Sequence, residues 1–147
     1  LNIGGRVVGM VVDAVSDVIA LKPVGVVLLI GTNDLEEGAT PETIADNVRL
    51  ILDALKAHDP HLPVVLCETF PSADSKSRPA DKIKKLNQLY AALAKGRPQV
   101  TRLETWPLFA DANGDAKPAE FPDLLHPNAT GYAQIGHSFY SWMKSKL

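Results

Sequence analysis

The sequence contains few of the residues on which several classes of protein depend. Of its 147 residues one is a cysteine, Cys67, which excludes an intramolecular disulfide framework and a cysteine-based zinc site. No apolar run approaches the roughly 20 residues that a membrane-spanning helix requires. Fifteen Lys and Arg residues against seventeen Asp and Glu residues give a net charge of -2. Because nucleic acids and anionic membrane surfaces attract clustered positive charge, the sequence argues against both as partners.

The length and composition indicate one folded domain. Apolar residues make up 46% of the chain and charged residues 22%, which is typical of globular proteins. The chain begins at Leu1 within an apolar stretch and shows no signal-peptide pattern there. The sequence therefore does not indicate the cellular compartment of the protein. We therefore expect a single domain over residues 1–147 whose N-terminal part is incomplete or processed.

Short aliphatic runs alternate with segments of helical periodicity along the chain. Residues 24–30, 64–67 and 100–103 are short and rich in branched aliphatic side chains, as expected for strands buried in a parallel sheet. The alternation predicts an α/β fold with a doubly wound, mostly parallel sheet. Helices are predicted over residues 6–21, from Pro41, after Pro79 and from about Gly131. The last helix is expected to bury Tyr132, Ile135, Phe139 and Trp142.

A short polar segment, residues 31–34 (Gly-Thr-Asn-Asp), follows the first predicted strand. Ligands of open parallel sheets bind outside the carboxyl ends of the strands, so the Asn33 carboxamide could direct its N–H donors into a cleft there. Gly, Asn and Asp are also common in ordinary turns, and the spacing alone slightly favours that interpretation.

A second polar segment lies near the end of the connection from Thr105 to Thr130, which is long for a compact domain. In it, Asp123 precedes His126 by three residues. If the segment turns, the carboxylate can accept the imidazole Nδ1–H and leave Nε2 as a general base. A surface histidine with an unrelated acidic neighbour is the alternative.

Taken together, the two segments resemble the SGNH, or GDSL-like, ester hydrolase family. The apolar run over residues 26–30 leads directly into Gly-Thr-Asn-Asp, and residues 123–128 (Asp-Leu-Leu-His-Pro-Asn) are followed by Gly-Tyr at 131–132. The resemblance extends over essentially the whole chain and is closest to the platelet-activating-factor acetylhydrolase-like and carbohydrate-esterase branches. It implies the three-layer α/β/α, flavodoxin-like SGNH fold.

The resemblance also implies roles for particular residues. Asn33 corresponds to the oxyanion-binding asparagine, and Asp123 and His126 correspond to the acid and base of the catalytic triad. Residues 2–4 (Asn-Ile-Gly) can be aligned with the family's Asn-x-Gly block, which makes the Gly4 N–H a second oxyanion donor. The glycines at 4–5 can instead be aligned slightly downstream of that block. The implied substrates are short-chain or acetyl esters of carbohydrates or lipids, and no residue pattern calls for a metal or an organic cofactor.

The nucleophile block of the family is absent from this sequence. There is no Gly-Asp-Ser, and none of the serines follows a predicted strand in a tight glycine turn. The family's first two strands are likewise expected to be missing, which would leave strand edges open. We therefore expect association with a second copy or with a complementing N-terminal segment that carries the serine. The serines are Ser16, Ser72, Ser75, Ser77, Ser138, Ser141 and Ser145.

Two other functions remain as alternatives. A domain degenerate from such a hydrolase could bind ligands or a protein partner without catalysis, as the missing serine allows. A flavodoxin-like phosphate binder would share the architecture, but the segment at 31–34 is short and acidic for a phosphate loop.

Overall fold

The computed structural model describes residues 8–72 and 77–146, the last of these by its backbone alone. Within these ranges, three parallel strands form one sheet in the order β1-β2-β3. They are β1 (Val26–Leu28), β2 (Val64–Cys67) and β3 (Val100–Leu103). The predicted α/β class is therefore confirmed.

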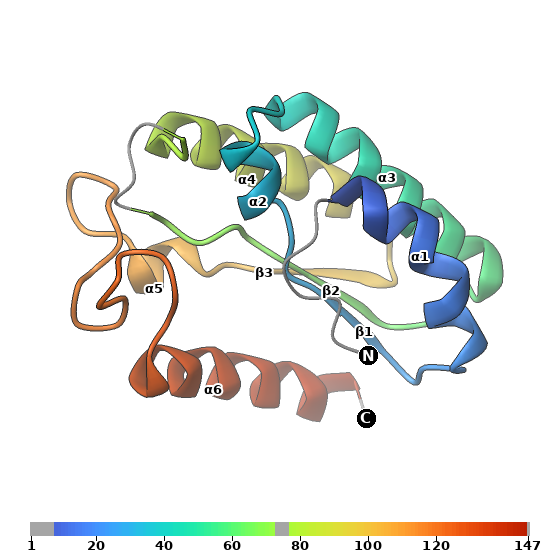
Figure 1. Cartoon of the computed structure of the whole chain (residues 1–147). Coiled ribbons are helices and arrows are strands. Elements are labelled where there is room, and N and C mark those ends of the chain that lie inside the picture. Colours follow the sequence, from blue (N-terminus) through green and yellow to red (C-terminus); the bar gives the residue numbers. More distant parts are fainter. Residues whose placement is uncertain (1–7, 73–76, 147) are drawn as a thin grey trace.

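Helices lie on both faces of the sheet (Figure 1). Long helices lie on one face, and the last helix lies across the opposite face, which gives the predicted three layers. Two short helices, one after β1 and one after β3, were not predicted. The helices are α1 (Val8–Ala20), α2 (Thr32–Glu36), α3 (Pro41–His58), α4 (Ala80–Ala94), α5 (Trp106–Phe109) and α6 (Ala129–Lys146).

Helix α3 shows how local sequence signals determine the layer that covers the sheet. The Thr40 hydroxyl accepts a hydrogen bond from the Thr43 N–H at 3.2 Å, and Pro41 occupies the first helical turn, where no N–H is needed. The buried side chains recur every three or four residues, so one apolar stripe faces the sheet. The buried residues of α3 are Pro41, Ile44, Ala45, Val48, Ile51, Leu52 and Leu55.

A second, smaller core joins the long segment before α6 to the rest of the domain. The rings of Phe70, Phe109 and Phe121 contact one another edge to face, with centroids 5.1 to 5.8 Å apart. Ile135 of α6 is buried in the same cluster. This packing fixes the position of the segment that carries Asp123 and His126.

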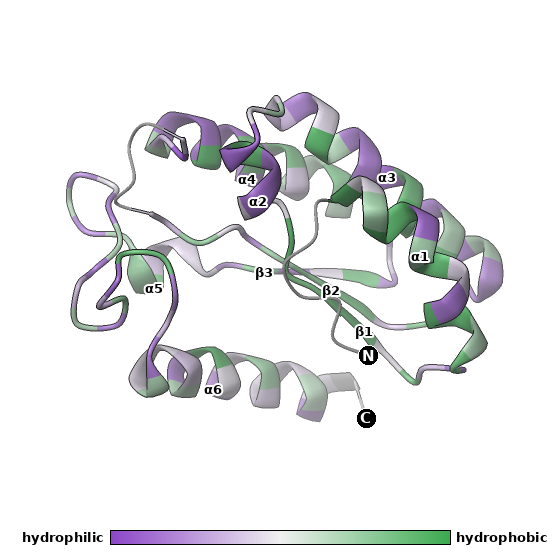
Figure 2. Cartoon of the chain, viewed as in Figure 1, coloured by the Kyte–Doolittle hydropathy of each residue, from purple (hydrophilic) through white to green (hydrophobic). Residues whose placement is uncertain are grey.

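Strand β1 is incompletely covered. It pairs with β2 on one side, and no described strand pairs with its other side. Figure 2 shows the strand as hydrophobic, yet Val27 is 49% exposed and Leu29, just after the strand, is 42% exposed. Because side chains alternate along a strand and Leu28 packs in the main core, Val27 and Leu29 face the layer that contains α6.

The prediction for α6 is partly wrong. Ile135 is buried as expected, and Phe139 and Trp142 are half-buried, but Tyr132 is 59% exposed. Helical periodicity places Tyr132 near the apolar face of α6. Periodicity does not show which part of that face other segments cover. Among the described residues, no helix is long and apolar enough to cross a membrane.

Candidate active site

Asn33 lies in α2, directly beyond the carboxyl end of β1. The chain turns sharply at Gly31, whose φ of 110° lies in the left-handed region that favours glycine. A Cβ atom at Gly31 would lie 2.8 Å from the Tyr90 hydroxyl oxygen and 3.0 Å from Leu86 Cδ2. The expected turn is therefore the beginning of a short helix, and only glycine fits at its first bend.

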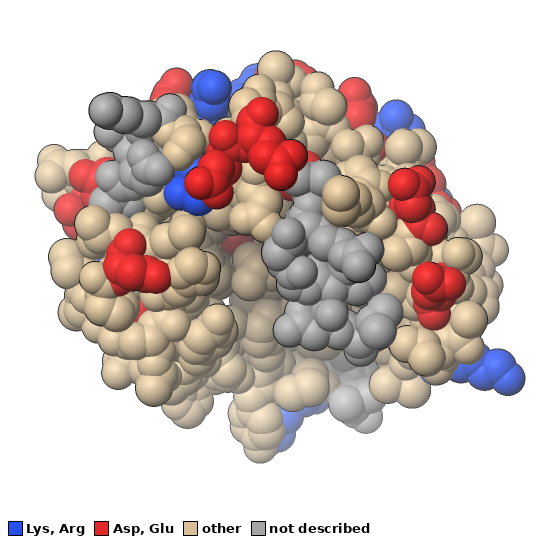
Figure 3. Space-filling view, in the orientation of Figure 1, with Lys and Arg blue, Asp and Glu red and all other residues tan. Residues whose placement is uncertain are grey.

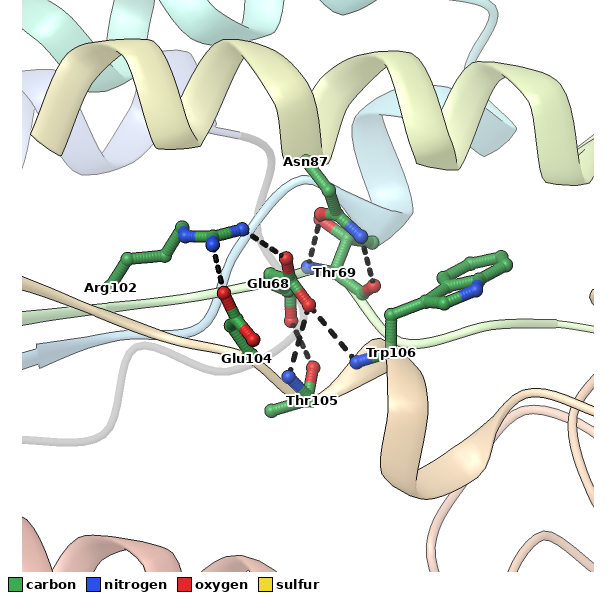
Figure 4. Close-up of polar contacts among 7 residues, drawn as sticks. All are labelled: Glu68, Thr69, Asn87, Arg102, Glu104, Thr105 and Trp106. Atoms are coloured by element: carbon green, nitrogen blue, oxygen red, sulfur yellow. Dashed lines mark hydrogen bonds and ion pairs between the residues drawn. The ribbon is translucent and has the colours of Figure 1, made fainter. Parts of the chain in front are cut away.

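A hydrogen-bond network holds this turn in place. The Ile30 carbonyl accepts from the Tyr90 hydroxyl at 3.1 Å and from the Thr69 hydroxyl at 3.3 Å. Asn87 of α4 binds the Thr69 backbone twice, accepting from its N–H at 2.8 Å and donating to its carbonyl at 3.0 Å (Figure 4). Burial, and secondarily the Asp34 carboxylate, raise the pKa of Tyr90 above its usual value, so the phenol remains a donor.

The Asn33 carboxamide itself is half-buried and has no hydrogen-bond partner within residues 8–72 and 77–146. Its two N–H donors are therefore available to a ligand. The neighbouring Asp34 is different, because its side chain is buried and its Oδ1 accepts from the Val8 N–H at 2.8 Å. Burial raises the pKa of Asp34, and this bond fixes α2 to the first described turn of α1.

Replacing Gly31 with alanine is expected to lower the free energy of unfolding by about 3 kcal/mol, since a left-handed backbone and a close contact with buried side chains both add cost. Chemical denaturation measures this change. Gly38→Ala is the matched control, because Gly38 also has a positive φ (88°) but no atom within 4 Å of the added Cβ. We expect a loss of about 1 kcal/mol there, from the backbone alone. Equal losses at the two positions would contradict the tight packing at Gly31.

Asp123 and His126 are brought together just before α6. The His126 Nδ1 lies 2.7 Å from Asp123 Oδ2. The other carboxylate oxygen accepts from the backbone N–H groups of His126 at 2.7 Å and Leu125 at 3.0 Å. Leu124, between them, has a φ of 63°, and this unusual conformation closes the turn.

These contacts explain the state of the pair. Hydrogen bonds lower the pKa of Asp123 to about 2, so the carboxylate is ionised at neutral pH. The largest effect comes from the His126 backbone N–H, followed by the His126 imidazole and the Leu125 N–H. An ionised acceptor on Nδ1 assigns the proton to that nitrogen and leaves Nε2 as the basic one. The His126 side chain is 71% exposed, so Nε2 is accessible.

A carbon-detected NMR titration of the Asp123 carboxyl is expected to give a midpoint near 2. Because this pKa is lower than the usual 3.8, ionised Asp123 favours the folded state above pH 3.8, and this contribution is lost as the pH falls toward 2. In His126→Ala the midpoint is expected to rise but to remain below 3.8, since both backbone donors persist. A midpoint at the usual value in the unmodified chain would contradict the observed bonds.

Both ends of the segment that carries the pair are anchored. At its start, the buried Glu68 carboxylate accepts from the N–H groups of Thr105 at 3.1 Å and Trp106 at 3.0 Å. At its end, Asn128 donates to the Ala119 carbonyl and caps α6 by accepting from the Gly131 N–H at 3.0 Å. No local sequence pattern marks Glu68, because its partners lie 37 and 38 residues away.

The structure brings together some of the residues predicted for the site. Asn33 lies in α2 after β1, and the Asp123–His126 pair lies in the segment before α6. Among the described residues, no hydrogen bond links Asn33 to the pair. Figure 3 shows that the face viewed in Figure 1 is hollowed near its centre. Gly4, the predicted second oxyanion donor, lies outside the described residues. Within the described part of the chain, no group of three or more His, Cys, Asp or Glu side chains could hold a metal ion.

Comparison with curated proteins identifies distant relatives. Platelet-activating factor acetylhydrolase IB subunit alpha1 of Pongo abelii is 26% identical over 121 residues, and subunit alpha2 of Homo sapiens is 26% identical over 115 residues. The matches cover 82% and 78% of this chain but 52% and 49% of the relatives. The chain therefore spans about half the length of the curated relatives it matches.

Comparison with solved structures shows the same fold. A GDSL-like lipase from Bacteroides thetaiotaomicron superimposes with a TM-score of 0.82 at 24% identity, over 97% of this chain and 73% of the other. The family 3 carbohydrate esterase of Clostridium thermocellum gives a TM-score of 0.70 at 20% identity, over 93% of this chain and 64% of the other. A model of the GDSL-like Lipase/Acylhydrolase family matches residues 1–134. The chain therefore belongs to the GDSL-like lipase/acylhydrolase family, the SGNH hydrolases that its two polar segments resemble.

Proposed function

We propose that this chain supplies the general base and the oxyanion-binding side chain of a serine ester hydrolase. In this proposal His126 is the base, Asp123 orients it, and the Asn33 carboxamide binds the oxyanion, with the Gly4 N–H as a second donor. The observation that carries the proposal is the 2.7 Å bond between His126 Nδ1 and the Asp123 carboxylate, which leaves an accessible Nε2. Family membership supports the same assignment, as does the lack of a partner for the Asn33 carboxamide among the described residues.

The reaction follows from these roles. His126 Nε2 takes the proton of a serine hydroxyl as its oxygen attacks the ester carbonyl, and the carbonyl oxygen becomes an oxyanion that accepts from Asn33. The tetrahedral intermediate collapses, and His126 returns the proton to the departing alcohol. Water then attacks the acyl-serine by the same two proton transfers, which releases the carboxylic acid and restores the serine.

The nucleophile in this proposal comes from residues outside this chain. The sequence holds no Gly-Asp-Ser block, and burial raises the pKa of the Cys67 thiol to about 12, so Cys67 stays protonated at neutral pH. Within the described part of the chain no strand pairs with the second side of β1, and Val27 and Leu29 are exposed. Both observations support a complementing strand beside β1. A second copy of the chain is the other source that this open edge allows.

Covalent labelling tests the proposal. The chain as it stands and a longer version carrying upstream residues of the same protein are incubated with a fluorophosphonate probe and with p-nitrophenyl acetate. We expect labelling and turnover in the longer version and none in the shorter one. Labelling of the shorter chain would contradict an external nucleophile. If neither version is labelled and neither hydrolyses the ester, the hydrolase proposal is overturned. That result would favour a non-catalytic binding domain, which the absence of Gly-Asp-Ser also allows.

The proposed substrates are acetyl or other short-chain esters of carbohydrates or lipids. Similar folds include a carbohydrate esterase, and the curated relatives are named as acetylhydrolases, which supports a small acyl group. The active form is therefore expected to hydrolyse p-nitrophenyl acetate faster than the butyrate, and the butyrate faster than the palmitate. Fastest turnover of the palmitate would contradict a small acyl pocket.

A further inference from the structure

A cleft of about 400 Å³ lies between α4 and the carboxyl end of β3, separate from the candidate active site. Lys84 and Gln88 of α4 line one wall, and Arg102, Glu104 and Trp106 line the other. The cleft lies on the edge strand β3, whereas Asn33 follows β1 at the other edge of the sheet. None of the three described residues assigned to the ester hydrolase lines it.

The floor of this cleft is fixed by a buried carboxylate. Glu68 accepts from the Thr105 and Trp106 backbone N–H groups and from Arg102 Nη1 at 2.7 Å. Arg102 also donates to Glu104, so the guanidinium bridges two carboxylates (Figure 4). These bonds hold the backbone of Trp106 and the Arg102 side chain, so the wall is formed before any ligand arrives.

The charges at the cleft cancel. Lys84 and Arg102 supply two positive charges, and Glu68 and Glu104 supply two negative charges. The Lys84 ammonium lies over the Trp106 ring, 5.5 Å from its centroid. The site therefore has an aromatic surface with hydrogen-bond donors and acceptors beside it but no excess charge that would select an ion.

We infer that this cleft binds a neutral sugar. An apolar sugar face can pack on the Trp106 ring, while its hydroxyl groups donate to Glu104 and accept from Lys84 and Gln88. The volume falls within the roughly 300–1,000 Å³ range of small-molecule sites. Glu68 and Asn87 take no part in recognition, because their side-chain bonds to the protein are already made.

The two tryptophans of the sequence allow a direct test on the chain as it stands. Proton–nitrogen NMR resolves the indole N–H signals of Trp106, which lines the cleft, and of Trp142 in α6, which does not. Titration with xylose, xylohexaose and cellohexaose is expected to shift the Trp106 signal saturably and to leave the Trp142 signal unchanged. Assignment uses Trp106→Phe, in which the shifting signal is expected to disappear.

Substitutions at the cleft sharpen the test. Gln88→Ala, at an exposed position, is expected to weaken sugar binding about 10-fold through the loss of a hydrogen bond to the ligand. Lys82→Ala is the matched control, because Lys82 is exposed on the same helix but does not line the cleft. Absence of a Trp106 shift with all three sugars, or equal shifts of both indoles, would overturn the inference. Binding needs no nucleophile, so a negative result here would leave the proposed hydrolase function untouched.

Discussion

Replacing His126 with alanine is expected to reduce turnover of the active enzyme by about 10⁴-fold or more. The imidazole is the proposed carrier of the proton between the serine and the leaving alcohol, and without it the serine attacks as a poor nucleophile. Asp123→Asn is expected to cost about 10⁴-fold, because an amide at this position can hold the imidazole in the wrong tautomer. Steady-state kinetics with p-nitrophenyl acetate measure both losses.

Folding is expected to survive both substitutions, since the two side chains are exposed. Thermal unfolding followed by circular dichroism provides that control. The double variant His126→Ala with Asp123→Asn should be no slower than His126→Ala alone, because Asp123 acts through the imidazole. Additive losses would show that Asp123 has a role independent of His126 and would contradict the proposed pair.

Replacing Asn33 with alanine is expected to lower kcat by about 100- to 1,000-fold, which is the usual cost of losing one oxyanion donor. KM should change little, because the oxyanion exists in the transition state and not in the bound ester. The fold should be retained, since the Asn33 carboxamide has no partner among the described residues. The measurement is the separation of kcat from KM in steady-state kinetics.

Asn113→Ala is the matched control for Asn33, because Asn113 lies exposed in the turn after α5 and is expected to be neutral. Asn33→Asp tests the chemistry further, since a carboxylate of similar shape repels the oxyanion and should be at least as damaging as alanine. A kcat within a few-fold of the parent in Asn33→Ala would remove this residue from the mechanism.

The sequence predicts the fold class well because the signals for it are local. Aliphatic runs flanked by turns and apolar stripes at helical spacing identify β2, β3 and α3. The helix start predicted at Pro41 agrees with the cap observed at Thr40. The Asp123–His126 contact is also local, since three residues separate the partners. The spacing in the sequence does not show whether the chain turns between Asp123 and His126. That turn depends on the positive φ of Leu124.

Long-range contacts account for what the sequence does not predict. Tyr90 and Ile30 are 60 residues apart, yet their hydrogen bond helps to fix the turn that precedes Asn33. Glu68 looks like an ordinary residue after a strand, and its three bonds become evident only when β3 lies beside β2. The exposure of Tyr132 likewise depends on which other segments pack on α6, and periodicity along one helix does not show this.

In the proposed mechanism, His126 and Asn33 act on the same reacting group. The most direct test is a crystal structure of the longer, labelled version after its serine has reacted with the fluorophosphonate. The phosphonyl oxygen stands in for the oxyanion of the tetrahedral intermediate. We expect it to accept a hydrogen bond from the Asn33 carboxamide, with His126 Nε2 adjacent to the serine oxygen. A phosphonyl group bound away from either side chain would contradict a shared role of His126 and Asn33.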